Sequence, residues 1–170
     1  LSRASDVYDP ATDSWAGVAS SNSAHNNTAA VGVINDRIYV AGGGTGSSLE
    51  VYDPVANTWT SLAPMSIPRN HCGGGVINGK LYVVGGRDSV QAPTALEVYD
   101  PQSNTWTSLA PMPTGRSGIG VAVIHGELYV FGGEIPTLHA EVEVYNPATN
   151  TWRQLPDMPA PRHGIWASVI

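Results

Sequence analysis

A tyrosine and a tryptophan seven residues apart recur four times along the chain, and this repeat limits the possible folds more than any other feature. Each tyrosine opens a Tyr-Asp-Pro or Tyr-Asn-Pro turn, and the pairs are Tyr8 and Trp15, Tyr52 and Trp59, Tyr99 and Trp106, and Tyr145 and Trp152. Successive pairs lie 44, 47 and 46 residues apart. A period of roughly 40 to 50 residues is typical of repeat architectures. We therefore expect several similar modules.

The stretch from Arg69 to Trp106 shows what one module contains. Two short apolar runs are joined by the dipeptide Asn78-Gly79, and the glycine pair Gly85-Gly86 follows the second run. After a polar loop, two further short runs follow, and the last contains Trp106. Asn-Gly between apolar runs is a strong hairpin signal. The pattern predicts one four-stranded antiparallel meander per module.

The repeat divides the chain into three complete modules between two incomplete ones. We expect the complete modules at residues 26–68, 69–115 and 116–161, the second half of a module at residues 1–25, and the first strand of another at residues 162–170. The chain has 19 glycines and 13 prolines, which favour many turns. Apolar residues do not recur at helical spacing, so the sequence predicts an all-β fold without a long helix.

The motifs of each module resemble the kelch repeat. Tyr39, Tyr82 and Tyr129 each open a Tyr-Val-x-Gly-Gly motif, which is followed by Val-Tyr-Asp-Pro or Val-Tyr-Asn-Pro and then a tryptophan, and Ala-Pro-Met segments link the modules. Kelch proteins are β-propellers of six or seven blades. The resemblance therefore implies a kelch-type β-propeller, present here as a partial ring, with each module as one blade.

Residues that recur in every blade are expected to build it. Glycine pairs permit backbone conformations and close approaches that side chains would prevent, and each buried Tyr or Trp removes roughly 150 to 250 Å² from water. An arginine ten residues after each tryptophan is expected to bond carbonyl groups or to stack on an aromatic ring, and Asn26 is expected to replace it in the first complete blade. The structural set is Gly42, Gly43, Gly85, Gly86, Gly132, Gly133, Tyr52, Tyr99, Tyr145, Trp59, Trp106, Trp152, Arg69, Arg116 and Arg162.

The blades differ in length at one place, the loop between the second and third strands. In an antiparallel meander this loop lies at the same end as the connection to the next blade, so one face of the ring carries the variation. Loops on a rigid scaffold commonly carry function. We predict a binding site on this face, built from residues that do not recur, namely Asn70, His71, Arg87, Asp88, Gln91, Ser117, Glu134, Thr137, His139 and His163.

The sequence contains no recognisable catalytic or metal-binding motif. The five histidines have no close ligand spacing, and HExxH, GxSxG and CxxC are absent. Residues 42–46 are glycine-rich, but they lack the Lys-Ser/Thr ending of a phosphate loop. We therefore predict no catalytic residue, no metal and no cofactor.

Charge and hydropathy exclude two classes of partner. The net charge is −6, Lys80 is the single lysine, and the arginines are scattered. A phosphate backbone is bound by clustered basic residues, so we expect no nucleic acid partner. No apolar run approaches the roughly 18 residues of a membrane span, so we expect no membrane partner.

Two functional classes remain. The first is a non-catalytic binding module for a protein or peptide, because the stretch from Pro68 to Gly79 resembles the kelch adaptors of cullin ubiquitin ligases. Such adaptors grip acidic peptides with clustered arginines, but His71, Gly118 and Gly164 stand two residues after the repeated arginine here. The second is part of a sugar-acting or glycan-binding kelch propeller, similar to galactose oxidase or bacterial sialic acid epimerases. Further expected partners are the remaining blades, or a second copy associating through open blade edges.

Overall fold

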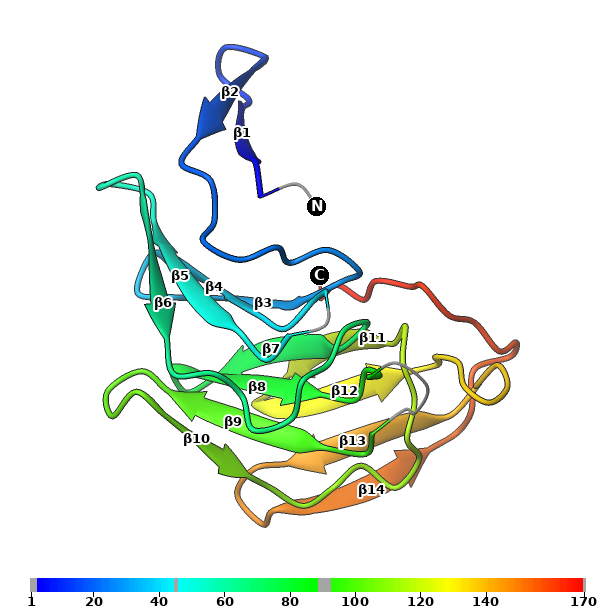
Figure 1. The fold of residues 1–170 in the computed structure, drawn as a ribbon. Coiled ribbons are helices and arrows are strands. Elements are labelled where there is room, and N and C mark those ends of the chain that lie inside the picture. Colours follow the sequence, from blue (N-terminus) through cyan, green and yellow to red (C-terminus); the bar gives the residue numbers. More distant parts are fainter. Residues whose placement is uncertain (1–2, 45, 89–92, 170) are drawn as a thin grey trace.

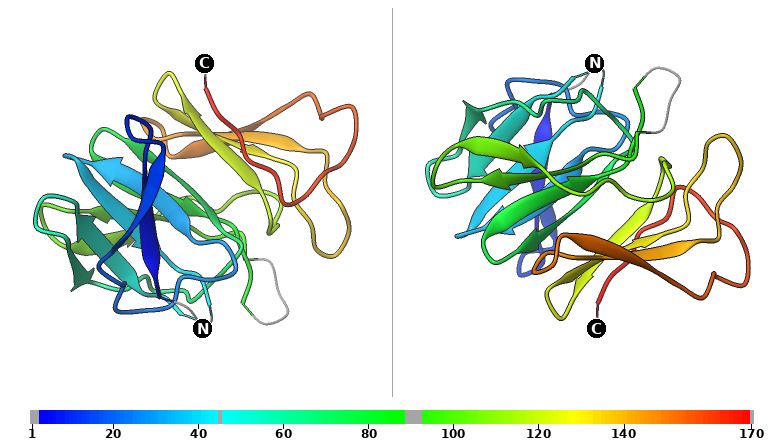
Figure 2. Two further views of the ribbon diagram at one scale, coloured as in Figure 1. Left: turned by 90° about the horizontal axis from the view of Figure 1, so that it is seen from above. Right: turned by 90° about the horizontal axis from the view of Figure 1, so that it is seen from below.

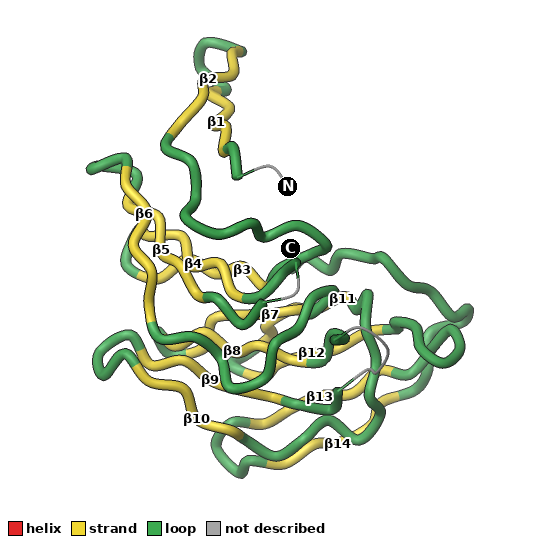
Figure 3. The backbone as a smooth tube through the Cα atoms, viewed as in Figure 1, coloured by secondary structure: helices red, strands yellow, loops and turns green. Residues whose placement is uncertain are grey.

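The structure is a computed structural model that describes residues 3–44, 46–88 and 93–169. These residues form fourteen strands. Figures 1 and 3 show strands joined by loops and no helix among the described residues. Accordingly, none of the described segments is a helix that could span a bilayer. The expected all-β fold is confirmed.

The strands form one two-stranded and three four-stranded antiparallel sheets, each with its strands in chain order. The N-terminal hairpin consists of β1 (Ser5–Asp9) and β2 (Ser14–Val18). The first blade comprises β3 (Ala30–Ile34), β4 (Arg37–Ala41), β5 (Leu49–Asp53) and β6 (Thr58–Leu62). The second blade comprises β7 (Gly73–Ile77), β8 (Lys80–Val84), β9 (Leu96–Asp100) and β10 (Thr105–Ser108). The third blade comprises β11 (Gly120–Ile124), β12 (Glu127–Phe131), β13 (Val142–Asn146) and β14 (Thr151–Leu155).

The C-terminal segment, residues 162–169, is not a strand in the structure, although the sequence pattern predicted one. A strand is defined by hydrogen bonds to a neighbouring strand, and no other described segment forms such a ladder with this one. The segment instead packs against the third blade, where a side chain at Gly120 would lie 3.2 Å from Ile165. Figure 2 shows the third blade and this segment to one side of the other two blades.

Each blade begins with a tight hairpin whose turn is set by local sequence. The turn residues are Asn35-Asp36, Asn78-Gly79 and His125-Gly126, and all six have positive φ. Two consecutive positive φ values define a type I′ turn, whose twist matches that of the flanking strands. Asn, Asp and Gly reach this conformation at low cost, so these dipeptides fix the register of the first two strands.

The inner strands pack closely because small residues of one blade face larger residues of the next. A side chain at Gly73 or Gly75 of β7 would come within 2.2 Å of Val121 and 2.6 Å of Val123 on β11, respectively. The glycines therefore allow the first strands of adjacent blades to approach each other. Two apolar clusters, which include residues of these strands, join the first blade to the second and the second to the third.

A tryptophan and an asparagine of each blade hold the chain segment that leaves the preceding blade. Trp59, Trp106 and Trp152 donate from Nε1 to the carbonyl oxygens of Ala19, Ala63 and Ala110 at 2.8, 2.7 and 2.8 Å. Asn57, Asn104 and Asn150 accept at Oδ1 from the backbone N–H groups of the same alanines. The tryptophan series thus joins blades through hydrogen bonds as well as through packing.

The same asparagines are also bonded by the repeated tyrosines. The Tyr99 hydroxyl donates to Asn104 Oδ1 at 2.9 Å, and Tyr99 packs on Trp106 with ring centroids 5.3 Å apart. Burial raises the pKa of Tyr99 to about 12, so its hydroxyl keeps the proton that it donates. Asn104 has φ +53, which suits asparagine better than most residues. The sequence pattern did not lead us to the asparagines, although every complete blade has one directly before its Thr-Trp dipeptide.

Replacing Asn104 by glycine is expected to destabilise the chain by about 1 kcal/mol, because both bonds to Oδ1 are lost while glycine still accepts the positive φ. Urea unfolding followed by tryptophan fluorescence measures this change. The matched control is Asn78→Gly, since Asn78 has φ +50 in a hairpin turn and does not join blades. Equal losses in the two variants would show that Asn104 acts only through its backbone conformation.

The second and third blades each contain one buried ion pair between a repeated arginine and a glutamate. Arg69 pairs with Glu97 and Arg116 with Glu143, each at 2.7 Å between Nη2 and Oε2. The arginines also donate to backbone carbonyls, those of Val83 and Ala95 in the case of Arg69. Arg69 and Arg116 therefore bond carbonyl oxygens, one of the two contacts that we expected. Arg162 is exposed, but its carbonyl accepts from Gly133, as those of Arg69 and Arg116 accept from Gly43 and Gly86.

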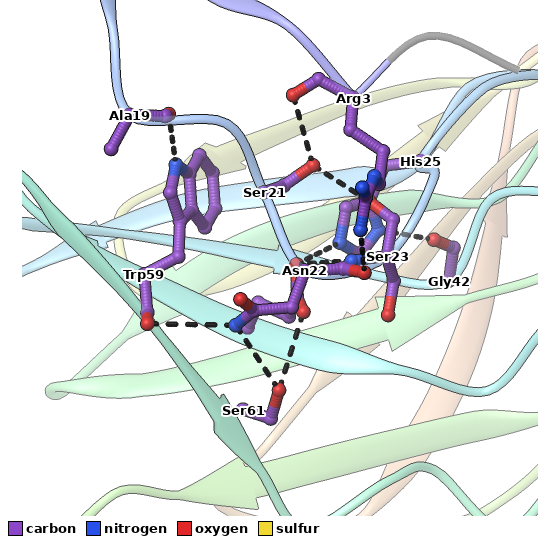
Figure 4. Close-up of polar contacts among 10 residues, drawn as sticks. Arg3, Ala19, Ser21, Asn22, Ser23, His25, Gly42, Trp59 and Ser61 are labelled. Atoms are coloured by element: carbon purple, nitrogen blue, oxygen red, sulfur yellow. Dashed lines mark hydrogen bonds and ion pairs between the residues drawn. The ribbon is translucent and has the colours of Figure 1, made fainter.

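His25, and not Asn26, occupies the arginine position of the first blade. His25 Nε2 contacts Glu50 Oε2 at 3.0 Å, and its Nδ1 contacts the Gly42 carbonyl at 2.7 Å (Figure 4). Glu50 is the first-blade counterpart of Glu97. The expectation for Asn26 was wrong because the extra residue lies after His25, at Asn27-Thr28, where both residues have positive φ. His25 thus keeps the ten-residue spacing from Trp15.

Candidate binding site

In each of the last two blades, the connection before the first strand pairs with the loop after the second strand. Asn70 forms an isolated antiparallel bridge with Arg87, and Ser117 forms one with Glu134. In both blades, the residue that follows the repeated arginine therefore lies beside the residue that follows the glycine pair. This pairing brings together residues that the sequence separates by 17 positions.

Four side chains from three successive repeats form a polar cluster, which we call the rim cluster: His71, Arg87, Glu134 and His163. Arg87 Nη1 donates to Glu134 Oε1 at 3.0 Å, and Arg87 Nη2 lies 3.1 Å from His71 Nε2. His163 Nδ1 lies 3.3 Å from the other oxygen of Glu134. The cluster thus bridges the variable loops of the second and third blades.

The hydrogen bonds of His71 fix its tautomer. A guanidinium group only donates, so His71 Nε2 accepts from Arg87, and Nδ1 carries the proton and donates to Asn70 Oδ1. Burial lowers the pKa of His71, and the positive charge of Arg87 lowers it further, while Glu134 opposes the shift. The ring is therefore held neutral, and protonation would place a donor against Arg87.

The pH dependence of stability should carry a contribution from His71. Its folded-state pKa lies below the ordinary value of 6.5, so the unfolded chain binds more protons in this range. The stability that comes from the neutral His71 ring is therefore fully present above about pH 6.5, and it is lost as the pH falls below that value. We expect the drop in urea midpoint between pH 7.5 and 5.5 to be smaller in His71→Asn than in the unsubstituted chain. Asparagine tolerates the φ of +51 at this position, and an identical drop in both would contradict the assignment.

The rim cluster borders a cavity of about 460 Å³ that lies against the inner strands. Side chains from β3, β11 and the C-terminal segment line it, among them Val31, Val121, Ile165 and Trp166. Trp166 is 85% exposed. A cavity of this size with apolar walls and a few polar groups at its edge is typical of ligand sites. The arrangement can hold an apolar group while its polar end meets the rim cluster.

The predicted site residues separate into three groups. His71, Arg87, Glu134 and His163 line the cavity, and Asn70 supports His71. Asp88 and Thr137 are exposed and do not line it, Ser117 is fully buried, and His139 is buried within its own loop against Glu141 and the Ile135 carbonyl. Gln91 lies outside the described residues.

Sequence reasoning missed the apolar walls of the cavity. Trp166 carried the clearest signal, because it is the one tryptophan of five outside the Tyr-Trp repeat. Val31 and Val121 belong to first strands, whose apolar pattern also occurs in an ordinary core. Among the described residues, no group of three or more His, Cys, Asp or Glu side chains could hold a metal ion.

The successive four-stranded antiparallel meanders, with their equivalent Tyr, Trp and Gly-Gly positions, define the class of kelch-type β-propeller proteins. The kelch family described as the KLHDC2/KLHL20/DRC7 Kelch-repeats domain matches residues 3–170. The chain belongs to this kelch-repeat family.

Curated relatives resemble about half of the chain. Kelch-like protein terF of Aspergillus terreus is 36% identical, over 48% of this chain and 20% of its own length. An F-box/kelch-repeat protein of Arabidopsis thaliana is 40% identical, over 48% of this chain and 23% of its own length. Kelch-like ECH-associated protein 1A of Danio rerio is 38% identical, over 48% of this chain and 15% of its own length. The chain therefore spans less than a quarter of these relatives.

The solved structures with a similar fold include that of YjhT. It superposes with a TM-score of 0.70 at 23% sequence identity, covering 80% of this chain and 53% of YjhT. At this level of identity the similarity concerns the fold alone.

Proposed function

We propose that the chain is a non-catalytic binding module that recognises a segment of a protein or peptide partner at the cavity. The observation that carries this proposal is the juxtaposition of apolar walls with the rim cluster, which is built from loops that vary between blades. An extended peptide offers an apolar side chain for such walls and backbone amides for such a rim. The name of the ECH-associated relative, which describes an association, is consistent with this role.

Selection of peptides from a random display library tests the proposal. We expect the chain to enrich peptides that lose at least about tenfold in affinity for the Trp166→Ala variant, since an interface aromatic commonly contributes more than 1.4 kcal/mol. Trp166 is 85% exposed, so its removal should leave the fold intact. The matched control is Val55→Ala, which changes an apolar residue that is 96% exposed and does not line the cavity. Enrichment of no peptide, or of peptides indifferent to Trp166, would contradict the proposal.

A glycan is the second candidate ligand, and the exposure of Trp166 beside polar side chains is the observation that favours it. An exposed indole offers a flat apolar face, and the carboxylate of Glu134 can accept hydrogen bonds from hydroxyl groups. A glycan array distinguishes the two ligands. Retention of a sugar that depends on Trp166, without any peptide enrichment, would favour the sugar-binding alternative.

We also propose that copies of the chain associate through the N-terminal hairpin and its open strand edges. Trp15 is 71% exposed, whereas its counterparts Trp59, Trp106 and Trp152 are half-buried, and Val7 of the same hairpin is 49% exposed. Apolar surface and strands with unpaired edges favour association. We expect light scattering to give a mass above the 17.8 kDa of one chain and Trp15→Ser to reduce it. A monomer at all concentrations would contradict this expectation.

A further inference from the structure

We propose that the rim cluster excludes acidic segments and favours uncharged ones, because Glu134 already supplies a carboxylate to Arg87. This inference names the chemistry of the partner and rests on the proposed binding function of the same cavity. Its physical basis is an ion pair between two loops that belong to different blades.

Among the residues that the structure describes, Arg87 is the one permanently charged cation that lines the cavity, and Glu134 of the same chain neutralises it. Its Nη1 donates to Glu134 Oε1 at 3.0 Å, while its Nη2 donates to His71 Nε2 at 3.1 Å. Both ends of the guanidinium group therefore have partners before any ligand arrives. A ligand carboxylate that reached Arg87 would also approach Glu134, and two carboxylates at one cation repel each other.

The surroundings of Glu134 do not remove this repulsion. His163 Nδ1 contacts Glu134 Oε2 at 3.3 Å, but the His163 side chain is half exposed, so solvent weakens this contact. His71 accepts a hydrogen bond from Arg87 as a neutral ring, so it adds no positive charge. Asp88 follows Arg87 in the same loop, and the chain as a whole carries a net charge of −6. The electrostatic field at the rim therefore disfavours an anion.

An uncharged amide meets the rim without this penalty. Arg87 retains N–H groups that can donate, and Glu134 offers a carboxylate that can accept, so a carboxamide or a peptide group can bond to both at once. Behind the rim, Val31, Val121 and Ile165 provide walls for an apolar side chain. The geometry thus selects a segment that combines an apolar residue with a neutral polar group.

Two small probes that differ only in charge test this selection, N-acetyl-aspartate N-methylamide and N-acetyl-asparagine N-methylamide. Binding is followed by NMR through the shifts of the His71 ring and the Trp166 indole. We expect the unsubstituted chain to show no saturable response to the aspartate probe. In Glu134→Gln, freeing Arg87 should increase affinity for that probe by about tenfold or more, since a charge-assisted hydrogen bond supplies this difference. The asparagine probe should bind both proteins within about threefold, well under the tenfold that 1.4 kcal/mol represents.

Two further variants assign the effect to the rim cluster. Glu127→Gln is the matched control, because Glu127 forms an exposed pair with Arg153 at 2.7 Å that does not line the cavity. It should leave the response of His71 and Trp166 to the aspartate probe unchanged. The double variant Glu134→Gln with Arg87→Gln should lose the gain, which shows that the freed guanidinium group binds the probe.

Two results would overturn the inference. One is saturable binding of the aspartate probe to the unsubstituted chain, and the other is a Glu134→Gln variant that gains no affinity for that probe. Neither result depends on the peptide selection described above. If selected peptides require Trp166 but are rich in Asp and Glu, the proposed function stands and the charge selection fails.

Discussion

Replacing Arg69 by alanine is expected to lower the free energy of unfolding by about 3 to 5 kcal/mol, because it leaves Glu97 as an uncompensated charge in the interior. Both side chains are almost fully buried, and Nη2 of Arg69 lies 2.7 Å from Oε2 of Glu97. Glu97 also accepts from the backbone and the hydroxyl group of Ser66, so it cannot simply turn toward solvent. Urea unfolding followed by tryptophan fluorescence at neutral pH measures the loss.

Two controls separate the buried charge from the loss of an ion pair as such. Arg37→Ala breaks the exposed pair with Asp53, in which 56% of the Arg37 side chain is accessible, and is expected to cost less than about 1 kcal/mol. The double variant Arg69→Met with Glu97→Leu removes both charges and should recover most of the stability. A double variant as unstable as Arg69→Ala would show that the carbonyl partners of Arg69, and not the charge of Glu97, determine the effect.

Replacing Gly86 by alanine is expected to cost about 3 kcal/mol or more, because a left-handed backbone and a steric conflict add at one position. Gly86 has φ +99, and an added Cβ would lie 2.7 Å from the Asn70 carbonyl oxygen and 2.9 Å from Cys72 Cβ. Backbone atoms on one side and a buried side chain on the other leave little room for relief. The same urea experiment measures the change.

Gly79→Ala is the matched control for Gly86. Gly79 also has positive φ, +73, but no atom lies within 4 Å of an added Cβ. Its expected cost is therefore the conformational term alone, about 1 to 2 kcal/mol. If both variants lose the same stability, the close approach of the second blade to the segment 70–72 does not contribute.

The local pattern was enough to predict the fold class. Turn dipeptides such as Asn78-Gly79, the alternation within short strands, and the constant Tyr-to-Trp spacing act over fewer than ten residues each, and the structure contains the expected meanders. The series of Asn and Glu residues recurs just as regularly, but its role was missed. A glutamate in an apolar strand suggests a buried ion pair, but the spacing along the chain does not show which residue is its partner.

The candidate site was predictable in part. Comparing the blades directed attention to the loops after the glycine pairs, and this comparison found Arg87 and Glu134. It could not tell which loop residues turn inward, so His139 was grouped with the site although it packs within its own loop. It also assigned no role to Trp166, which lies outside the repeat.

The sequence by itself determined the antiparallel modules, their hairpin turns and their kelch character, because these follow from contacts between neighbours in the chain. Only the tertiary structure decided that Arg87 meets Glu134, 47 residues further on, and that His71 and Trp166 border the same cavity. The physical reason is that contacts between blades depend on how one sheet is rotated and stacked against the next. That geometry is set by the packing of Gly73 and Gly75 on Val121 and Val123, and spacing along the chain does not reveal it.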